Sequence, residues 1–257
     1  MKQILLFLFY CASALGQKAQ IQDIHPGPYT QLVESFPKIV MEKSSVIAQK
    51  INDTLQSELF KAKPGTAEEH LLDEIRTDAM PMLRDVSYKL ILNDDRILCL
   101  EFNMEGCGAY CEYFTCYYTF DLNNGQKIMP DDLFTESGLK KLTAKINTDK
   151  VNKIKRQLLE INKSLNTNSK GPNGENRNTL NEMLVMYKNC LQYQAEDGDL
   201  SDYKFAVNPG KLYFYTERCS AHVNRAIDEL DEFVYELEIK YWTSYLTPYG
   251  KSIFAVK

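Results

Sequence analysis

The chain has 257 residues, of which 44% are hydrophobic and 25% are charged, and this composition is typical of a globular protein. Its formal net charge is −5, which argues against nucleic acid as the main partner because phosphate binding needs a basic surface. The 16 tyrosines and 12 phenylalanines favour β-rich packing.

The N-terminus has the features of a secretory signal peptide. Lys2 precedes an apolar run over 4–14, and the small residues Ala14 and Gly16 stand where a signal peptidase would cleave. The run is shorter than the ~20 apolar residues that span a bilayer, and no later stretch is apolar enough. The sequence therefore predicts a cleaved signal peptide over 1–16, a secreted or periplasmic protein, and no integral membrane span.

The following elements alternate between strands and helices. Residues 17–28 are polar, contain Pro26-Gly27-Pro28, and are expected to form a flexible leader. The pattern then predicts an edge strand over 33–40, a helix over 43–61, a second helix starting near residue 66, and a strand over 86–92.

The stretch 96–122 carries four of the seven cysteines and two strand-forming arms around a centre that contains Gly106 and Gly108. It predicts a hairpin with a cross-linked tip, which together with the strand before it makes a three-strand antiparallel meander. A helix over 138–165 follows, broken near 147–149, and the polar loop 166–178 is the best internal boundary.

The C-terminal part begins with a helix over 179–193, for which Thr179 and Glu182 form a capping box. The pattern then predicts strands over 203–207, 211–215 and 233–239, a short helix over 241–246, and a last strand over 252–256. The predicted fold class is α+β: the meander plus C-terminal strands, packed with several helices. The parts 29–165 and 179–257 are expected to form one composite domain.

Cleavage after Gly16 would remove Cys11 and leave six cysteines, an even number that indicates disulfides in an exported chain. If the hairpin folds about 107–108, three pairs are expected: Cys99 with Cys116, Cys107 with Cys111, and Cys190 with Cys219. The competing interpretation is a zinc site made by Cys107, Cys111 and Cys116, but the spacings are looser than those of a zinc knuckle. We therefore predict no metal and no cofactor.

No catalytic motif is present. Paired carboxylates such as Asp131 and Asp132, or Asp228 and Asp231, would serve glycoside hydrolysis if they faced each other across a cleft. A capping role for the first pair and a surface position for the second are the simpler interpretations, so we predict no catalytic residues.

The segment from Cys107 to Phe134 resembles the core of the RsiV-like domain family, which includes the extracytoplasmic part of the anti-sigma factor RsiV and the non-catalytic N-terminal part of the deacetylase PdaC. The matching segments are Gly108-Ala109-Tyr110, in place of Gly-Ala-His, then Phe120-Asp121-Leu122, Gly125 and Asp132-Leu133-Phe134, with upstream Phe36–Ile39 and Lys50–Asn52 and downstream Phe205–Phe214. The chain departs from the family at Tyr110 and over 217–228, which carries Cys219.

The resemblance implies an exported, non-catalytic binding module of the cell envelope. Because RsiV-type domains are associated with recognising lysozyme, it also implies a lysozyme-like wall hydrolase or the wall polymer, peptidoglycan, as partner. The hairpin tip, with Gly108, Ala109 and Tyr110, is the expected contact. The alternatives are a secreted enzyme acting on cell-wall carbohydrate and a structural component of the envelope.

Overall fold

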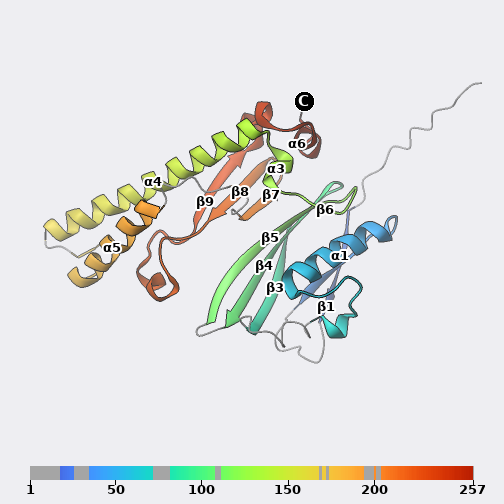
Figure 1. Ribbon diagram of the computed structural model, residues 1–257, viewed down its shortest axis with the longest axis horizontal. Helices are drawn as coiled ribbons and strands as arrows, with labels where there is room; N and C mark the ends of the chain where they lie inside the picture. Colours follow the sequence, from blue (N-terminus) through green and yellow to red (C-terminus); the bar gives the residue numbers. More distant parts are fainter. Residues whose placement is uncertain are drawn as a thin grey trace, which may run out of the picture.

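The structure is a computed structural model that describes residues 18–25, 35–71, 82–107, 111–167, 170–171, 174–193, 200 and 204–256. The molecule is elongated, with α1 and β1 towards one end and the helices α4 and α5 projecting at the other (Figure 1). The strands are β1 (Gln20–Ile24), β2 (Phe36–Val40), β3 (Met82–Asn93), β4 (Ile97–Cys107), β5 (Cys111–Asp121), β6 (Gln126–Lys127), β7 (Lys204–Asn208), β8 (Lys211–Thr216) and β9 (Phe233–Glu238). The α-helices are α1 (Ser45–Phe60), α3 (Pro130–Leu133), α4 (Glu136–Asn166), α5 (Arg177–Tyr193) and α6 (Pro248–Ile253), and the short 3-10 helices are η1 (Glu68–His70), η3 (His222–Ile227), η4 (Ile239–Tyr241) and η5 (Thr243–Tyr245). This arrangement confirms the predicted α+β class.

The polar segment that we expected to be a flexible leader contains a strand. β1 pairs antiparallel with β2, from Gln20 opposite Val40 to Ile24 opposite Phe36. The Asn93 side chain fixes the start of this strand, because its amide donates to the Ala19 carbonyl (2.8 Å) and its oxygen accepts from the Ala19 N–H (3.1 Å). The prediction failed at 20–24 because backbone pairing stabilises a strand that has almost no apolar pattern.

Helix α1 covers one face of the meander. Its residues Ile51, Leu55 and Phe60 are fully buried against aromatic side chains of β2 and β4. The buried Asn52 side chain bonds both the N–H and the carbonyl of Ile39 (2.8 Å each), which joins the helix to β2 without leaving a polar group unpaired. The helix ends where Lys61 adopts a left-handed backbone conformation (φ 57°).

The meander is confirmed as the sheet β3-β4-β5, with the short β6 beside β5. Cys107 stands opposite Cys111, so Cys99 lies opposite Thr119 and Cys116 lies opposite Phe102. The expected Cys99–Cys116 disulfide is wrong, and both of these thiols are free. The prediction placed Cys116 opposite Cys99, but Thr119, three residues further along β5, occupies that position. Because side chains alternate between the two faces of a sheet, a shift by an odd number of residues places Cys116 on the face opposite to Cys99. Cys99 accordingly belongs to the core on one face, and Cys116 packs against the core on the other.

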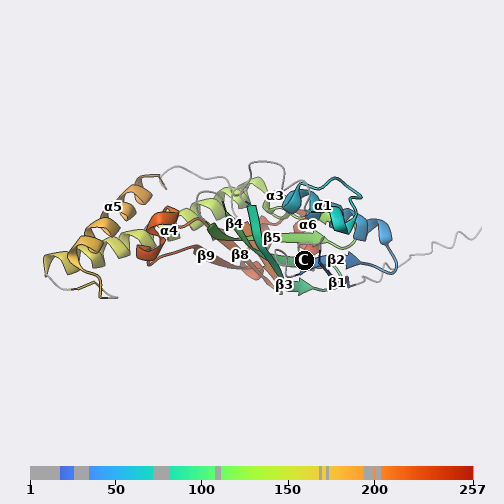
Figure 2. The ribbon, with the colours of Figure 1, turned by 90° about the horizontal axis from the view of Figure 1, so that it is seen from below.

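A second antiparallel sheet, β7-β8-β9, packs against the outer face of the meander. The rings of Tyr117 on β5 and Tyr215 on β8 stack at 4.3 Å between the two sheets. Helix α4 lies along β8 and β9 in both views (Figures 1 and 2), and it contributes Leu142 and Ile146 to this core. α4 runs without interruption through 147–149, where we had expected a break.

The far half of α4 and helix α5 form an arm that has its own small core. Ile154 and Ile161 of α4 meet Leu180, Met183 and Tyr187 of α5. The predicted Cys190–Cys219 disulfide is present and ties α5 to the segment after β8. α5 begins two residues earlier than expected, because the Asn176 side chain accepts from the N–H groups of Asn178 (2.9 Å) and Thr179 (3.1 Å). The division of the chain into parts ending at 165 and starting at 179 stays a prediction.

The C-terminus is helical rather than extended, so the strand expected over 252–256 is wrong. Thr247 caps α6 by accepting from the Gly250 N–H (2.9 Å), and Pro248 occupies the first turn, where its missing N–H costs nothing. Gly250 is required there, because a Cβ at this position would lie 2.2 Å from the Leu133 carbonyl oxygen. This close approach fixes the end of the chain against α3.

Candidate binding cleft

A cleft of about 440 Å³ opens between the first half of β5 and the segment that joins β8 to β9. It lies where the C-terminal part of the chain meets the meander near the hairpin tip. The residues that line it are Glu112, Tyr113, Phe114, Thr115, Lys204, Glu217, Arg218, Ser220, Ala221, Arg225, Asp231 and Glu232.

One wall of the cleft is an open strand edge. β6 pairs with β5 only at Phe120 and Asp121. Within the part of the chain that the structure describes, no strand pairs with the outer edge of β5 at 112–115. The confirmed Cys107–Cys111 disulfide closes the end of this hairpin and holds the wall in register. An open edge with its backbone groups available is a common place for a partner to bind.

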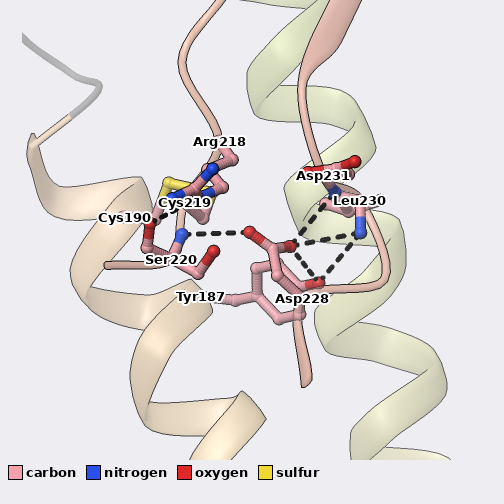
Figure 3. The surroundings of a disulfide bond; sticks show 8 residues. All are labelled: Tyr187, Cys190, Arg218, Cys219, Ser220, Asp228, Leu230 and Asp231. Carbon is pink, nitrogen blue, oxygen red and sulfur yellow. Dashed lines mark hydrogen bonds between the residues drawn. A yellow bond between two sulfur atoms is a disulfide. The ribbon is translucent and has the colours of Figure 1, made fainter. Parts of the chain in front are cut away.

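The other wall has little regular structure and is fixed by a buried carboxylate (Figure 3). Asp228 accepts hydrogen bonds from the Tyr187 hydroxyl (2.8 Å) and from the N–H groups of Ser220 (2.9 Å), Leu230 (3.2 Å) and Asp231 (3.3 Å). The adjacent Cys190–Cys219 disulfide anchors the same segment to α5. Burial and the bond to Asp228 raise the pKa of Tyr187, which keeps its hydroxyl protonated as the donor.

The charges in the cleft are mixed. Arg218 joins the two walls by an ion pair with Glu112, and its Nε donates to the Ser220 carbonyl (3.2 Å). Arg225 lies 3.9 Å from an Asp231 carboxylate oxygen. Four acidic and three basic side chains therefore face the cleft, namely Glu112, Glu217, Asp231 and Glu232 with Lys204, Arg218 and Arg225.

Glu232 has a perturbed carboxyl group. Desolvation by the surrounding chain raises its pKa above the ordinary value, while Lys204 and the nearby arginines act in the opposite direction. A carboxyl with a raised pKa inside a cleft is a feature that functional sites share with structural clusters. Burial therefore makes the Glu232 carboxyl hold its proton to a higher pH than an ordinary glutamate does.

Two aromatic side chains on the β5 wall are accessible to solvent. Tyr113 is 63% exposed and Phe114 is 37% exposed, although large aromatic groups are normally buried. They point to opposite sides of the strand, and the charge of Glu105, which stands opposite Tyr113 in the ladder, raises the tyrosine pKa. Exposed aromatic residues beside a charged cleft are typical anchors of protein interfaces.

Of the predicted partner contacts, Gly108, Ala109 and Tyr110 lie outside the described residues. Their neighbours Cys107 and Cys111 form a disulfide, and the wall residues Glu112 and Tyr113 follow directly. Contact of a partner with the tip itself stays a prediction.

The cysteines at the hairpin tip do not form a thiolate metal site in this structure. Ligand atoms of Glu105, Cys107 and Cys111 lie within 4.8 Å of one another, and Cys116 is not part of this group. The two sulfurs are bonded to each other, and a disulfide is not a thiolate ligand. Cys99 is buried and accepts from the Thr119 hydroxyl (3.3 Å) and the Val207 N–H (3.4 Å), and its burial raises the thiol pKa.

The predicted carboxylate pairs do not face each other across a cleft. Asp132 caps the start of α3 by accepting from the Met129 N–H (2.8 Å), as expected. Asp228 is not on the surface, because four hydrogen bonds hold it inside the arm. Only Asp231 of these residues lines the cleft.

Apart from Asp231, the sequence pattern does not mark the residues of this cleft as a site. The segment 217–232 has no strand or helix periodicity, and only a disulfide and a buried carboxylate place it opposite β5. Cys219 was the one sequence signal that this segment has a fixed position, since a cysteine in an irregular segment of an exported protein predicts a disulfide that restrains it.

Comparisons with known proteins support the fold. Neither a family model nor a curated protein matches the chain. A solved member of the DUF3298 family from Bacteroides fragilis is similar in structure, with a TM-score of 0.52 and 12% identity over 93% of this chain and 97% of that one. A DUF3298 family protein from Pseudomonas aeruginosa gives a TM-score of 0.45 and 9% identity over 91% and 94% of the two chains. At 12% identity, the similarity to the Bacteroides fragilis protein concerns the fold alone. In the described part of the chain, none of the helices has the length and apolar character needed to cross a bilayer.

Proposed function

We propose that this chain is an exported, non-catalytic binding module of the cell envelope that recognises a lysozyme-like wall hydrolase through the cleft beside β5. The observation that carries the proposal is the combination of an open strand edge, the exposed Tyr113 and Phe114, and a cleft with charges of both signs. Rigid aromatic anchors beside charged groups are the usual composition of a protein-binding surface.

The choice of partner rests on the resemblance to the RsiV-like family. The fold similarity to a DUF3298 protein is consistent with a domain of that type. The acidic net charge of −5 suits a basic enzyme, since opposite net charges accelerate encounter. The cleft itself has almost no net charge, because its acidic and basic groups nearly balance. It would contribute shape and the aromatic anchors Tyr113 and Phe114 to the binding of a partner.

The compartment is part of the proposal. Two disulfides fit an oxidising environment. The predicted signal peptide over 1–16 lies outside the described residues. If the chain is exported, the mature protein starts at Gln17 and carries two disulfides and two free thiols, Cys99 and Cys116.

The test is binding of the purified, oxidised chain from Gln17 to Lys257 to a panel of lysozymes and to insoluble peptidoglycan, at low and high salt. We expect saturable, salt-sensitive binding to a lysozyme. Tyr113→Ala should weaken it about tenfold, the effect of losing a moderate interface anchor. Tyr241→Ala, which truncates a similarly exposed tyrosine (71%, against 63% for Tyr113) outside the cleft, is the matched control.

Three outcomes would contradict the proposal: binding to no lysozyme by a folded chain, equal weakening by both tyrosine variants, or binding to peptidoglycan alone. The last result would make the wall polymer the ligand. Failure of Tyr113→Ala to weaken lysozyme binding would move the contact away from the cleft.

A second candidate is an enzyme acting on cell-wall carbohydrate, which the raised pKa of Glu232 among the other acidic groups of the cleft favours. Release of reducing sugar from peptidoglycan, abolished by Glu232→Gln, would establish it. No release by the unmodified chain would leave Glu232 a structural or binding group.

A further inference from the structure

A second surface, away from the cleft, combines an unpaired strand edge with a basic helix face. β9 is the last strand of the sheet β7-β8-β9, and β8 is the only strand that pairs with it among the described residues. Its free edge borders a groove of about 580 Å³ that α4 lines on the other side. The residues of the groove are Asp149, Asn152, Lys153, Lys155, Arg156, Leu159, Val234, Tyr235 and Glu236.

The acidic residues of this groove already have partners. Asp149 pairs with Lys145 one helical turn away (3.5 Å), and Glu236 pairs with Lys211 across the β8–β9 ladder. Glu238, further along β9, pairs with Lys240 (2.6 Å). The partners of these three carboxylates, Lys145, Lys211 and Lys240, do not line the groove.

The basic residues of the α4 wall are left uncompensated. Lys155 and Arg156 are exposed, and no ion pair to either is present in the described part of the chain. Lys153 has its ammonium 5.9 Å from the centre of the Phe233 ring, a cation–π contact that leaves its charge unneutralised. Three cationic groups consequently face the groove, and each carboxylate among its described lining residues already has a partner elsewhere.

Apolar side chains mark the two sides of the same groove. Leu159 on α4 is 68% exposed and Val234 on β9 is 45% exposed, so each keeps a surface that water solvates poorly. Successive side chains of an extended peptide point to opposite faces. If such a peptide paired with β9, alternate side chains would cover Val234, and the side chains between them would face α4. The free edge would supply backbone hydrogen bonds, and α4 would supply positive charge.

We propose that this groove binds an extended acidic segment of another polypeptide, which adds to β9 as a fourth antiparallel or parallel strand of the sheet. Backbone pairing gives such a complex its affinity, and the side chains that face α4 give it specificity. The groove selects carboxylate side chains at alternate positions, because only those face Lys153, Lys155 and Arg156. The site is separate from the cleft beside β5 and shares no lining residue with it.

The probe for this site is an acetylated octapeptide of alternating glutamate and valine, and its binding to the oxidised chain starting at Gln17 is measured by calorimetry or fluorescence anisotropy. We expect the variant Lys155→Glu/Arg156→Glu to weaken binding roughly tenfold, since two exposed charge contacts become repulsive. The control Lys163→Glu/Lys188→Glu makes the same change of net charge at exposed positions of α4 and α5 that lie outside the groove. Circular dichroism verifies that both variants are folded.

Peptide chemistry tests the backbone pairing. N-methylation at every second residue blocks the donors on one edge of an extended peptide, and methylation at the other residues blocks the opposite edge. We expect one of these two peptides to lose binding and the other to retain it. An octapeptide of alternating lysine and valine should not bind.

The proposal is overturned if the control variant weakens binding as much as the groove variant, or if both N-methylated peptides bind like the parent, since the surface would then be a basic patch without strand pairing. Self-association through β9, detected by sedimentation velocity, would also overturn it by making a second copy the occupant. Tyr113→Ala should leave peptide binding unchanged, so failure of this proposal and failure of the proposed function are distinguishable.

Discussion

The two ends of the molecule are stabilised in different ways. Among the described residues, the core under α1 contains 19 buried hydrophobic residues, whereas the core of the α4–α5 arm contains 8. The described residues of the first core include no disulfide, but the arm adds the Cys190–Cys219 disulfide and the hydrogen bonds of Asp228. The difference shows that a core too small to stabilise its elements by burial alone is supplemented by covalent and polar restraints.

The largest effect is expected in the core under α1. Phe102 is fully buried among Phe36, Tyr88 and Tyr118, so Phe102→Ala should lower the free energy of unfolding by about 4 kcal/mol through lost burial and a cavity. Urea denaturation measures the change. Phe114→Ala removes the same atoms from an exposed position and should cost less than about 1 kcal/mol. Similar losses for both variants would show that the core is not packed as described.

The next effect concerns the arm. Replacing Cys190 and Cys219 by serine opens a loop of 29 residues, which should cost about 3.5 kcal/mol in the chain-entropy model. Replacing Cys107 and Cys111 opens a separation of only 4 residues and should cost about 2 kcal/mol. Hydrogen exchange should show faster opening of α5 in the first variant while β4 stays protected. Loss of protection in both regions would mean that the arm and the meander unfold as one unit.

The smallest effect comes from Lys150, a buried lysine of α4 whose ammonium lies 5.0 Å from the Phe233 ring centre. Desolvation lowers its pKa to about 8 in the folded state, and Glu217 opposes this shift only in part. The unfolded chain therefore binds more protons between pH 8 and the ordinary lysine pKa of 10.5, and the free energy of unfolding rises with pH across this window.

Lys150→Met retains the apolar stem and removes the charge. It should be more stable than the parent chain by about 1–3 kcal/mol at pH 7, and this advantage should shrink towards zero at pH 10. Denaturation of both proteins at several pH values measures the difference. A constant difference over this range would show that Lys150 is solvated or paired in the folded protein.

The helices and the meander could be predicted because their patterns are local. Ile51 and Leu55 repeat at helical spacing, and the alternating residues of 96–122 identify two strands. The register could not be predicted, since moving the centre of the turn by one and a half residues changes every pairing by three. This shift of three residues places Cys99 and Cys116 on opposite faces of the sheet, so they do not form a disulfide.

The cleft and the groove depend on contacts between distant segments. Arg218 meets Glu112 across 106 residues of sequence, and no local pattern marks either residue as one of a pair. The groove depends on β9 being the outermost strand, which is a property of sheet order rather than of the residues 233–238. Export, which the N-terminal pattern and the cysteine count indicate, stays a prediction, and neither signal indicates where on the fold a partner would bind.

The register of the β4–β5 hairpin, which places Cys99 opposite Thr119 and not opposite Cys116, has a consequence for oxidative folding. Cys99 and Cys116 project from opposite faces of one sheet, so a correctly paired hairpin keeps these two sulfurs insulated from each other. A molecule that contains a Cys99–Cys116 disulfide must therefore have paired β4 and β5 in a shifted register. The Cys99–Cys116 disulfide would thus identify the misfolded population, and peptide mapping of an oxidised preparation would detect it.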